Sequence, residues 1–366
     1  MATIPTEMDE ATRDALRDSV ASVLAEQSDS MAVHAFIDGK STLDRDLWTQ
    51  AASLGWLGFG IPEEHGGLGM GAQGLAILHT ELGRQAAPGS FISTLSAAQA
   101  IAEAGTDEAR KTWLPRLASG EIGAAVPATL GAASLAWSGG NVFGTLRCLG
   151  APNAAFVLAP AGDVWVIVEL TAADVTVAPM WDPTRTAIEI RLRDAKPAAV
   201  LEDGASVADS LLQAMALAIA ADSAGAARSI TERTIAYMKT REQFGQPIAG
   251  FQALKHRAAD LATRLAVMDE MVAHAIERVA GNEPDADIWI SLAKAEATEN
   301  FVFIATDCVQ LHGGVGFTWD YDPQIFLKRA RLNEVLAMAN PALRDRAAAG
   351  LAAATRAGHS ALELGL

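Results

Sequence analysis

The sequence predicts a mainly helical protein with one small β domain. Its 366 residues are too many for one ordinary core, and half of them are hydrophobic, so we expect two or three packed domains. Apolar residues recur at helical spacing near both ends of the chain, whereas the hydrophobic pattern between them has a period of two. We therefore predict an N-terminal helical domain (1–123), a β domain (124–203) and a C-terminal four-helix bundle (204–366).

The first part, from residue 8 to about residue 123, is predicted to contain helices and loops only. Leu16, Val20 and Val23 lie on one face of the first helix, and similar three- and four-residue steps recur further along. A loop reading IPEEHGGLG interrupts the helices, because a helix cannot contain so many Pro and Gly residues. Pro115 predicts the end of the last helix in this part.

Strict alternation predicts the β domain. In AIEIRLR, the apolar residues Ile188, Ile190 and Leu192 alternate with charged residues, which is typical of half-buried strands. FVLAPA and VWVIVEL predict two more strands. We expect a small antiparallel sheet.

Long helices are predicted again in the C-terminal part, where they pack as a bundle. We expect helices at about 206–240, 251–281, 285–310 and 323–339. The second carries a stripe of Leu and Met residues, which we interpret as core rather than as a ligand site. Pro341 is expected to end the fourth helix.

Charge and composition exclude several classes of function. A net charge of −16 argues against a nucleic-acid partner, which needs a basic face. We expect no apolar run of membrane-span length. The acidic start MATIPTEMDEATRD is unlike a signal peptide, so we expect a cytoplasmic protein without a membrane partner. Cys148 and Cys308 have no His or Cys at metal-ligand spacing, and we expect both to be buried and no metal to be bound.

Residues 237–252, reading YMKTREQFGQPIAGFQ, predict a compact corner that suits a phosphate group. Arg241 could offer the planar five-donor fork of its guanidinium to a diphosphate. Phe244 could lie on an adenine or flavin face, and Gly245 lets the backbone turn. The simpler alternative is that Arg241 only satisfies the last carbonyl groups of its helix and the helix dipole.

A second motif, QLHGGVGF, follows further along the chain. R-x-Q-F-G and Q-x-x-G-G-x-G-F together resemble the C-terminal domain of acyl-CoA dehydrogenases. LGWLGFGIPEEHGGLGMG, ELGR and WLPRLASGE stand in that family's order in the first third. The resemblance, which covers nearly the whole chain, implies that the β domain is the family's barrel-like middle domain. It also implies FAD as cofactor and the α,β-desaturation of an acyl-CoA thioester.

The β domain departs from the family pattern. Similar family members carry T-E-P-x-x-G-S-D just after the first strand and W-I-T-N later, and these residues hold the flavin ring. The matching segment here reads AAVPATLGAASLAWSGG, which keeps Pro127 but lacks the preceding Glu and the following Ser-Asp. The W-I-T equivalent is absent, and the domain is shortened. The resemblance thus implies that this chain does not hold the flavin ring.

The catalytic glutamate of the family is also missing. In that chemistry a carboxylate removes the α-proton while the flavin takes the β-hydride. The family places this glutamate at one of two positions. When Ala330 and Arg331 are matched to the family's A-K pair, the first position falls on Ala337, and the second falls on Met215. Neither side chain can accept a proton, so we assign no catalytic residue.

Acidic residues on nearby elements remain as alternatives: Glu334, Asp222 and Asp320. Glu334 is one turn before Ala337, but most helix glutamates are simply solvated. Asp222 is two turns beyond Met215 and is an alternative base, although a buried carboxylate is costly unless it is paired and could serve a structural role instead. Asp320 belongs to a predicted loop.

The chain resembles the short, non-catalytic subunit of two-component α2β2 acyl-CoA dehydrogenases, which include enzymes of steroid side-chain degradation. This resemblance implies a partner subunit that holds the flavin ring and the catalytic Glu. The residues implied to grip the diphosphate end of FAD, here called the half-site, are Arg241, Gln243, Phe244, Gln252, Gln310, Gly313 and Gly314. His312 is expected to be a packing residue. Two alternatives stay open: a stand-alone acyl-CoA dehydrogenase with Asp222 or Glu334 as base, and a scaffold subunit without flavin.

Overall fold

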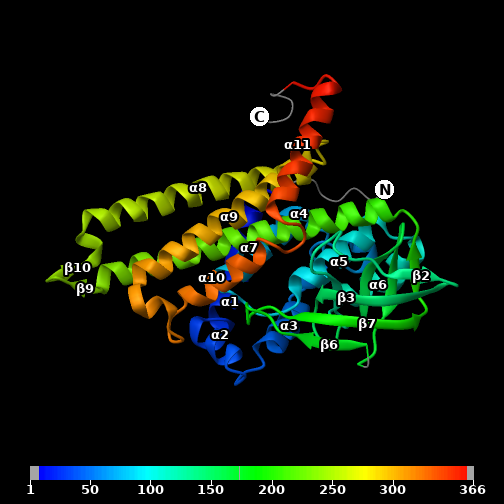
Figure 1. Cartoon of the computed structure of the whole chain (residues 1–366), viewed down its shortest axis with the longest axis horizontal. Coiled ribbons are helices and arrows are strands. Elements are labelled where there is room, and N and C mark those ends of the chain that lie inside the picture. Colours follow the sequence, from blue (N-terminus) through cyan, green and yellow to red (C-terminus); the bar gives the residue numbers. More distant parts are fainter. Residues whose placement is uncertain (1–7, 173, 361–366) are drawn as a thin grey trace.

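The computed structural model describes residues 8–172 and 174–360. Figure 1 shows an N-terminal group of helices, a β-sheet beside it and a long C-terminal group of helices. This arrangement confirms the predicted fold class, which is mainly α with a small β domain.

The N-terminal part is helical, as predicted. Its helices are α1 (Glu10–Gln27), α2 (Ser30–Ile37), α3 (Leu43–Ser53), α4 (Gly71–Arg84), α5 (Phe91–Ala104) and α6 (Asp107–Ala118). The Pro- and Gly-rich loop between α3 and α4 holds the short 3-10 helices η1 (Trp56–Gly58) and η2 (Glu63–His65). The prediction that Pro115 ends α6 was wrong, because the helix continues to Ala118. Leu117 and Ala118 are buried, and their packing outweighs the loss of the backbone hydrogen bond that proline cannot make.

The middle part forms one mixed sheet in the order β6-β7-β3-β1-β4-β5-β8, with β2 paired to β3. The strands are β1 (Ala124–Pro127), β2 (Ala136–Ser138), β3 (Asn141–Leu149), β4 (Phe156–Ala161), β5 (Val164–Glu169), β6 (Val175–Ala178), β7 (Ala187–Ala195) and β8 (Ala199–Leu201). The predicted alternation in β7 is confirmed, because Ile188, Ile190 and Leu192 are all buried. The prediction of an antiparallel sheet was wrong for one pair of strands, because β1 and β4 are parallel. Strand β3 runs antiparallel to β1 on one side, and the chain then returns as β4 on the other side of β1.

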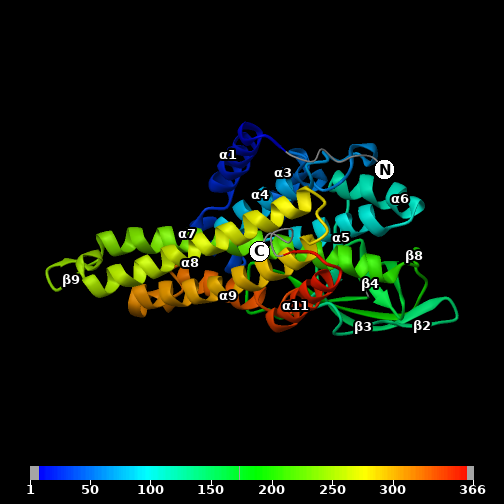
Figure 2. The same cartoon turned by 90° about the horizontal axis from the view of Figure 1, so that it is seen from above.

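The C-terminal part contains α7 (Gly204–Thr240), α8 (Gln252–Ala280), α9 (Ala286–His312), α10 (Pro323–Asn333) and α11 (Asn340–Arg356). Figures 1 and 2 show α7, α8 and α9 side by side, and α10 packs against α9 and α7. The fourth predicted helix ends earlier than expected, at Asn333, and α11 was not predicted. Pro341 lies in the first turn of α11, where the missing N–H costs nothing, so it opens a helix instead of ending one.

Helix α7 corrects the expectation that no apolar run reaches membrane-span length. An 18-residue window within it has a mean hydropathy of 1.4, so by length and composition alone the helix could cross a membrane. However, 67% of that window is buried inside the fold, where α7 packs against α4, α5, α8 and α9. Its apolar character therefore fits the central helix of a packed core.

The two cysteines are buried, as predicted, and burial raises the pKa of each thiol to about 12. The described residues contain no cluster of His, Cys, Asp or Glu that could hold a metal ion.

Candidate functional site

The predicted half-site residues gather at one end of the bundle. Helix α7 ends, α8 begins and α9 ends at this point, with the hairpin of β9 (Glu242–Gln243) and β10 (Gln246–Pro247) projecting beyond them (Figure 1). The residues of the half-site are all exposed: Arg241, Gln243, Phe244, Gln252, Gln310, Gly313 and Gly314. The fold therefore brings the two sequence motifs to one open surface.

Phe244 occupies an unusual position at the tip of the hairpin. The two-residue turn has φ values of 55° at Phe244 and 80° at Gly245, which is the type I′ geometry that favours Asn and Gly. Phe244 is 93% exposed, and its ring lies edge-on to Phe251 with 6.1 Å between ring centroids. A bulky aromatic ring held outward at a conformational cost indicates binding rather than packing.

Arg241 follows the last residue of α7, and its backbone closes the corner. Its N–H donates to the Tyr237 carbonyl at 2.8 Å, and its carbonyl accepts from the N–H of Ile248 at 2.8 Å. Within residues 8–172 and 174–360, no hydrogen bond or ion pair engages the Arg241 guanidinium. The guanidinium therefore does not hydrogen-bond to the last carbonyl groups of α7, and its five donors are free among the described residues.

Gly313 and Gly314 form the second side of the surface, in the 3-10 helix η4 (Gly313–Phe317). A Cβ placed on either glycine would meet no atom within 4 Å, and Gly313 has a φ of 66°. Beneath them, the His312 ring stacks on Tyr237 with 4.3 Å between centroids, and its Nδ1 lies 2.8 Å from the Cys308 carbonyl. His312 therefore packs α9 against α7, as expected.

This surface offers groups of the kind that bind a diphosphate. It combines a free guanidinium, an outward aromatic ring and a glycine backbone that a ligand can approach closely. The exposed glutamine side chains add amide donors and acceptors at its rim.

The two positions matched to the family glutamate lie in the interior. Met215 and Ala337 are both fully buried, and both belong to the apolar cluster that joins the C-terminal helices to the sheet. The chain thus brings these two positions into one region, and neither supplies a proton acceptor there.

A backbone bridge joins Ala337 to the segment that follows β1. The N–H of Ala337 donates to the Ala128 carbonyl at 2.9 Å, and the Ala337 carbonyl accepts from Leu130 at 2.7 Å. Thr129 pairs with Ala337 in a parallel β-bridge, and its Oγ1 donates to the Val335 carbonyl at 3.2 Å. Because residues 128–130 match the family's ring-holding segment, this contact occupies the backbone groups of both segments.

Lys294 holds the same segment from the side of α9. Its ammonium donates to the carbonyl groups of Glu334 and Met338, both at 2.8 Å, and to Asn340 Oδ1 at 3.1 Å. Burial lowers the pKa of Lys294 to about 7. The three acceptors compensate the ammonium and fix the turn that contains Ala337.

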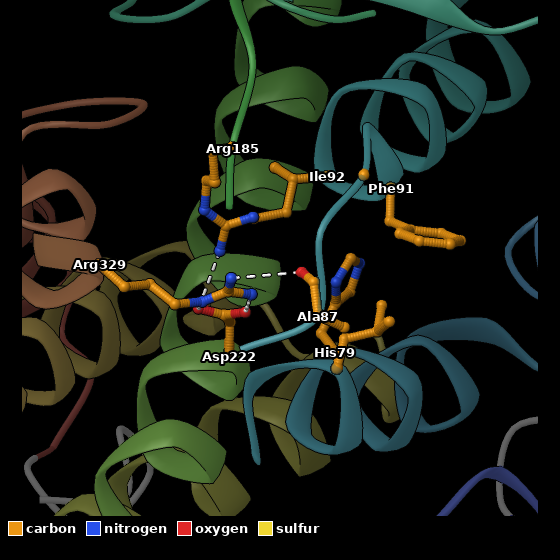
Figure 3. A pocket seen from close by; sticks show the side chains of 9 residues that line it. His79, Ala87, Phe91, Ile92, Arg185, Asp222 and Arg329 are labelled. Carbon is orange, nitrogen blue, oxygen red and sulfur yellow. Dashed lines mark hydrogen bonds and ion pairs between the residues drawn. The ribbon is translucent and has the colours of Figure 1, made fainter. Parts of the chain in front are cut away.

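Asp222 lies in a buried ionic network and is not placed as a base (Figure 3). Arg329 binds both of its carboxylate oxygens, at 2.5 and 3.1 Å, and Arg185 lies 2.8 Å from Oδ2. Asn333 donates to Oδ2 at 2.9 Å. Burial alone would raise the pKa of Asp222, but the arginines outweigh it and hold that pKa well below its usual range. This geometry fits the alternative in which Asp222 has a structural role as a paired, buried carboxylate.

The space beside this network does not admit an acyl group. The hollow lined by His79, Phe91 and Asp222 is too narrow for a water molecule. Next to it α4 and α7 touch through their backbones: a Cβ on Gly83 would lie 2.1 Å from the Asp222 carbonyl oxygen, and one on Gly225 2.0 Å from that of Thr80.

The other alternative acids are not near this hollow. Glu334 is half-buried at the end of α10, and its carboxylate accepts from Arg331 at 3.2 Å. Asp320 is exposed in the loop before α10.

Sequence reasoning missed Arg185, Arg329 and Lys294. Asp222 stands in the apolar run AIAADSAG, and a charge in such a run signals a buried cation nearby. Nothing in the sequence indicates which arginine supplies it.

Comparisons with known proteins agree with the motifs and the fold. Residues 6–121 match the acyl-CoA dehydrogenase N-terminal domain, and residues 202–351 match the acyl-CoA dehydrogenase C-terminal domain. Acyl-CoA dehydrogenase IpdE2 of Mycolicibacterium smegmatis is 32% identical over 324 residues, which are 87% of this chain and 92% of that protein. Acyl-CoA dehydrogenase FadE34 of Mycobacterium tuberculosis is 32% identical over 81% of this chain, which spans only 41% of FadE34.

A solved structure shows the same fold. The ChsE4-ChsE5 complex from Mycobacterium tuberculosis contains a chain that is 26% identical, with a TM-score of 0.80 and coverage of 97% of this chain and 100% of that one. Given the two matching domains, the identity to IpdE2 and this shared fold, the chain belongs to the acyl-CoA dehydrogenase family.

Proposed function

We propose that this chain is the non-catalytic subunit of a two-component, FAD-dependent acyl-CoA dehydrogenase that desaturates an acyl-CoA thioester between Cα and Cβ. It contributes the diphosphate side of the FAD site, and a partner subunit supplies the flavin-ring site and the catalytic Glu. The assembly is an α2β2 heterotetramer in the cytoplasm, and its substrates belong to lipid or steroid catabolism.

The bridge at Ala337 carries this proposal. It joins the segment matched to the family's ring-holding motif to a position matched to the family's catalytic Glu, and neither segment has the family's residues, while the half-site at the end of the bundle is exposed. A chain that retains one side of a cofactor site and lacks the residues of the other needs a second chain to complete it.

The half-site residues have separate roles in this proposal. Arg241 binds the diphosphate with its planar fork, and Phe244 stacks on an aromatic face of the nucleotide. Gly313 and Gly314 let the backbone approach the diphosphate, while Gln243, Gln252 and Gln310 hydrogen-bond to the polar rim. When bound, FAD supplies the acceptor for the β-hydride.

A partner subunit is supported by the comparison with ChsE4-ChsE5, since that structure is a complex of two different chains. The stand-alone alternative is disfavoured because Asp222 is paired with arginine and Glu334 with Arg331. The scaffold alternative gives no reason for an outward Phe244 or for an unpaired Arg241.

Flavin retention by the purified complex tests the proposal. The chain is co-expressed with candidate partner subunits, and the pair is purified with Arg241, Arg241→Glu or Arg356→Glu. Arg356 is exposed on α11 and provides a charge reversal away from the half-site. We expect Arg241→Glu to release FAD while the subunits stay together, and Arg356→Glu to retain it.

Two outcomes would contradict the proposal. The first is unchanged flavin content in the Arg241→Glu pair, which would favour the scaffold. The second is an isolated chain that binds one flavin per monomer and oxidises an acyl-CoA, which would show a complete site.

A further inference from the structure

The segment 313–322 connects the glycines of the half-site to α10, and two side chains tie it to helix α2 of the N-terminal part. We propose that α2 positions this segment for the cofactor, with Asp322 and Trp319 as the positioning residues. This inference rests on the proposed function, because it assigns to α2 a role in FAD retention at the same half-site.

Asp322 makes the stronger tie. Its Oδ1 accepts from Ser30 Oγ at 2.5 Å and lies 3.0 Å from His34 Nε2, so both contacts come from α2. Its Oδ2 accepts from Arg233 of α7 at 2.5 Å, and Arg233 also donates to Gln85 Oε1 at 3.1 Å. The carboxylate therefore joins α2, α7 and the start of α10 at one half-buried point.

Trp319 makes the second tie. Its indole N–H donates to Asp38 Oδ1 at 2.7 Å, at the C-terminal end of α2. The ammonium of Lys328 lies over the same ring, 5.0 Å from its centroid. An aromatic ring that is 47% exposed thus has two polar contacts.

The packing of this segment is uneven. Gly316 is buried and the Tyr321 ring lies edge-on to His312, but the positions nearest the half-site have little packing. Gly313 and Gly314 are exposed and contact nothing where a side chain would be, and Phe317 is 68% exposed. A glycine segment that is free to move loses more entropy when it binds a ligand. Contacts that hold the segment before binding reduce this loss and slow the release of the ligand.

The test weakens the ties from the α2 side, where no substituted residue belongs to the half-site. The double variant Ser30→Ala/His34→Ala removes both α2 contacts to Asp322, and Asp38→Ala removes the acceptor of Trp319. Asp38→Asn keeps an acceptor oxygen and should behave as the original residue does. Thr106→Ala removes the N-cap of α6, which is a structural contact elsewhere in the N-terminal helices, and serves as control.

Two readouts are measured on the co-expressed pair. Amide hydrogen exchange of residues 313–322 is measured in the pair after flavin removal, and FAD release is followed by fluorescence on dilution of the loaded pair. We expect faster exchange and about ten-fold faster FAD release for the double variant and for Asp38→Ala. Asp38→Asn and Thr106→Ala should change neither readout.

The result separates the two proposals. Unchanged exchange in the double variant and in Asp38→Ala overturns the role of α2. Faster exchange with unchanged FAD release also overturns the role of α2. If Arg241→Glu releases FAD in that case, the proposed half-site is still supported. If neither Arg241→Glu nor the α2 variants alter FAD release, both proposals fail.

Discussion

The two regions described above use arginine in opposite ways. At the end of the bundle, Arg241 is exposed, and its guanidinium has no partner among the described residues. In the interior, Arg329 is fully buried, and Asp222 binds it through two oxygens. A free guanidinium on an open surface is available to a ligand, whereas a paired and buried one holds the fold together. Substitutions in the two regions should therefore separate cofactor retention from stability.

Asp222→Asn should have the largest effect on stability. It leaves Arg329 and Arg185 buried without their carboxylate, and we expect the free energy of unfolding to fall by about 3–5 kcal/mol in a urea titration. Asp269→Asn breaks the partly exposed pair with Arg228 and should cost less than about 1 kcal/mol. Equal costs for the two variants would contradict a special role of the buried network.

Gly225→Ala should follow, with a loss of about 1–3 kcal/mol, because the added Cβ would lie 2.0 Å from the Thr80 carbonyl oxygen. Gly314→Ala adds the same methyl group in open space, so its stability should change by less than about 0.5 kcal/mol. Flavin content of the folded pair should show the reverse pattern, with a loss only for Gly314→Ala. A flavin loss confined to Gly225→Ala would place the cofactor in the interior.

The pH dependence of unfolding gives a third test of the interior. The pKa of Asp222 is lowered in the folded state, so its stabilisation is present above its unfolded pKa and is lost as the pH falls. Between about pH 5 and pH 3, the original chain should lose about 1 kcal/mol more than Asp222→Asn does. Parallel pH profiles for the two chains would show that Asp222 does not contribute as an anion.

Phe244→Asn should have the smallest effect on stability, and its sign should be favourable. Asn suits the first position of a type I′ turn better than Phe does, so the melting temperature should stay the same or rise slightly. The flavin-to-protein ratio of the pair should nevertheless fall, because the outward ring is gone. A ratio that stays at the original value would remove Phe244 from the half-site.

Local pattern was enough to predict much of this molecule. The apolar stripe of α8 and the alternation of β7 are short-range features, and the structure contains both. The two half-site motifs could be placed together because short connections between long antiparallel helices bring the helix ends to the same side.

Other contacts have no local pattern. Asp222 and Arg329 are separated by 107 positions, and His34 and Asp322 by 288, so no periodicity relates them. The end of α10 at Asn333 could not be predicted from local pattern either. The turn that follows it contains the left-handed backbone of Ala337, which is held by hydrogen bonds to Ala128 and Leu130.

The conformation of Ala337 limits which side chains this position can carry. With a φ of 61° and no exposed surface, the position would strain any larger side chain and bury its charge in hydrocarbon. A glutamate at this position would therefore lower the stability of the folded chain through both effects. Introducing a carboxylate here calls for changes in the neighbouring segments as well.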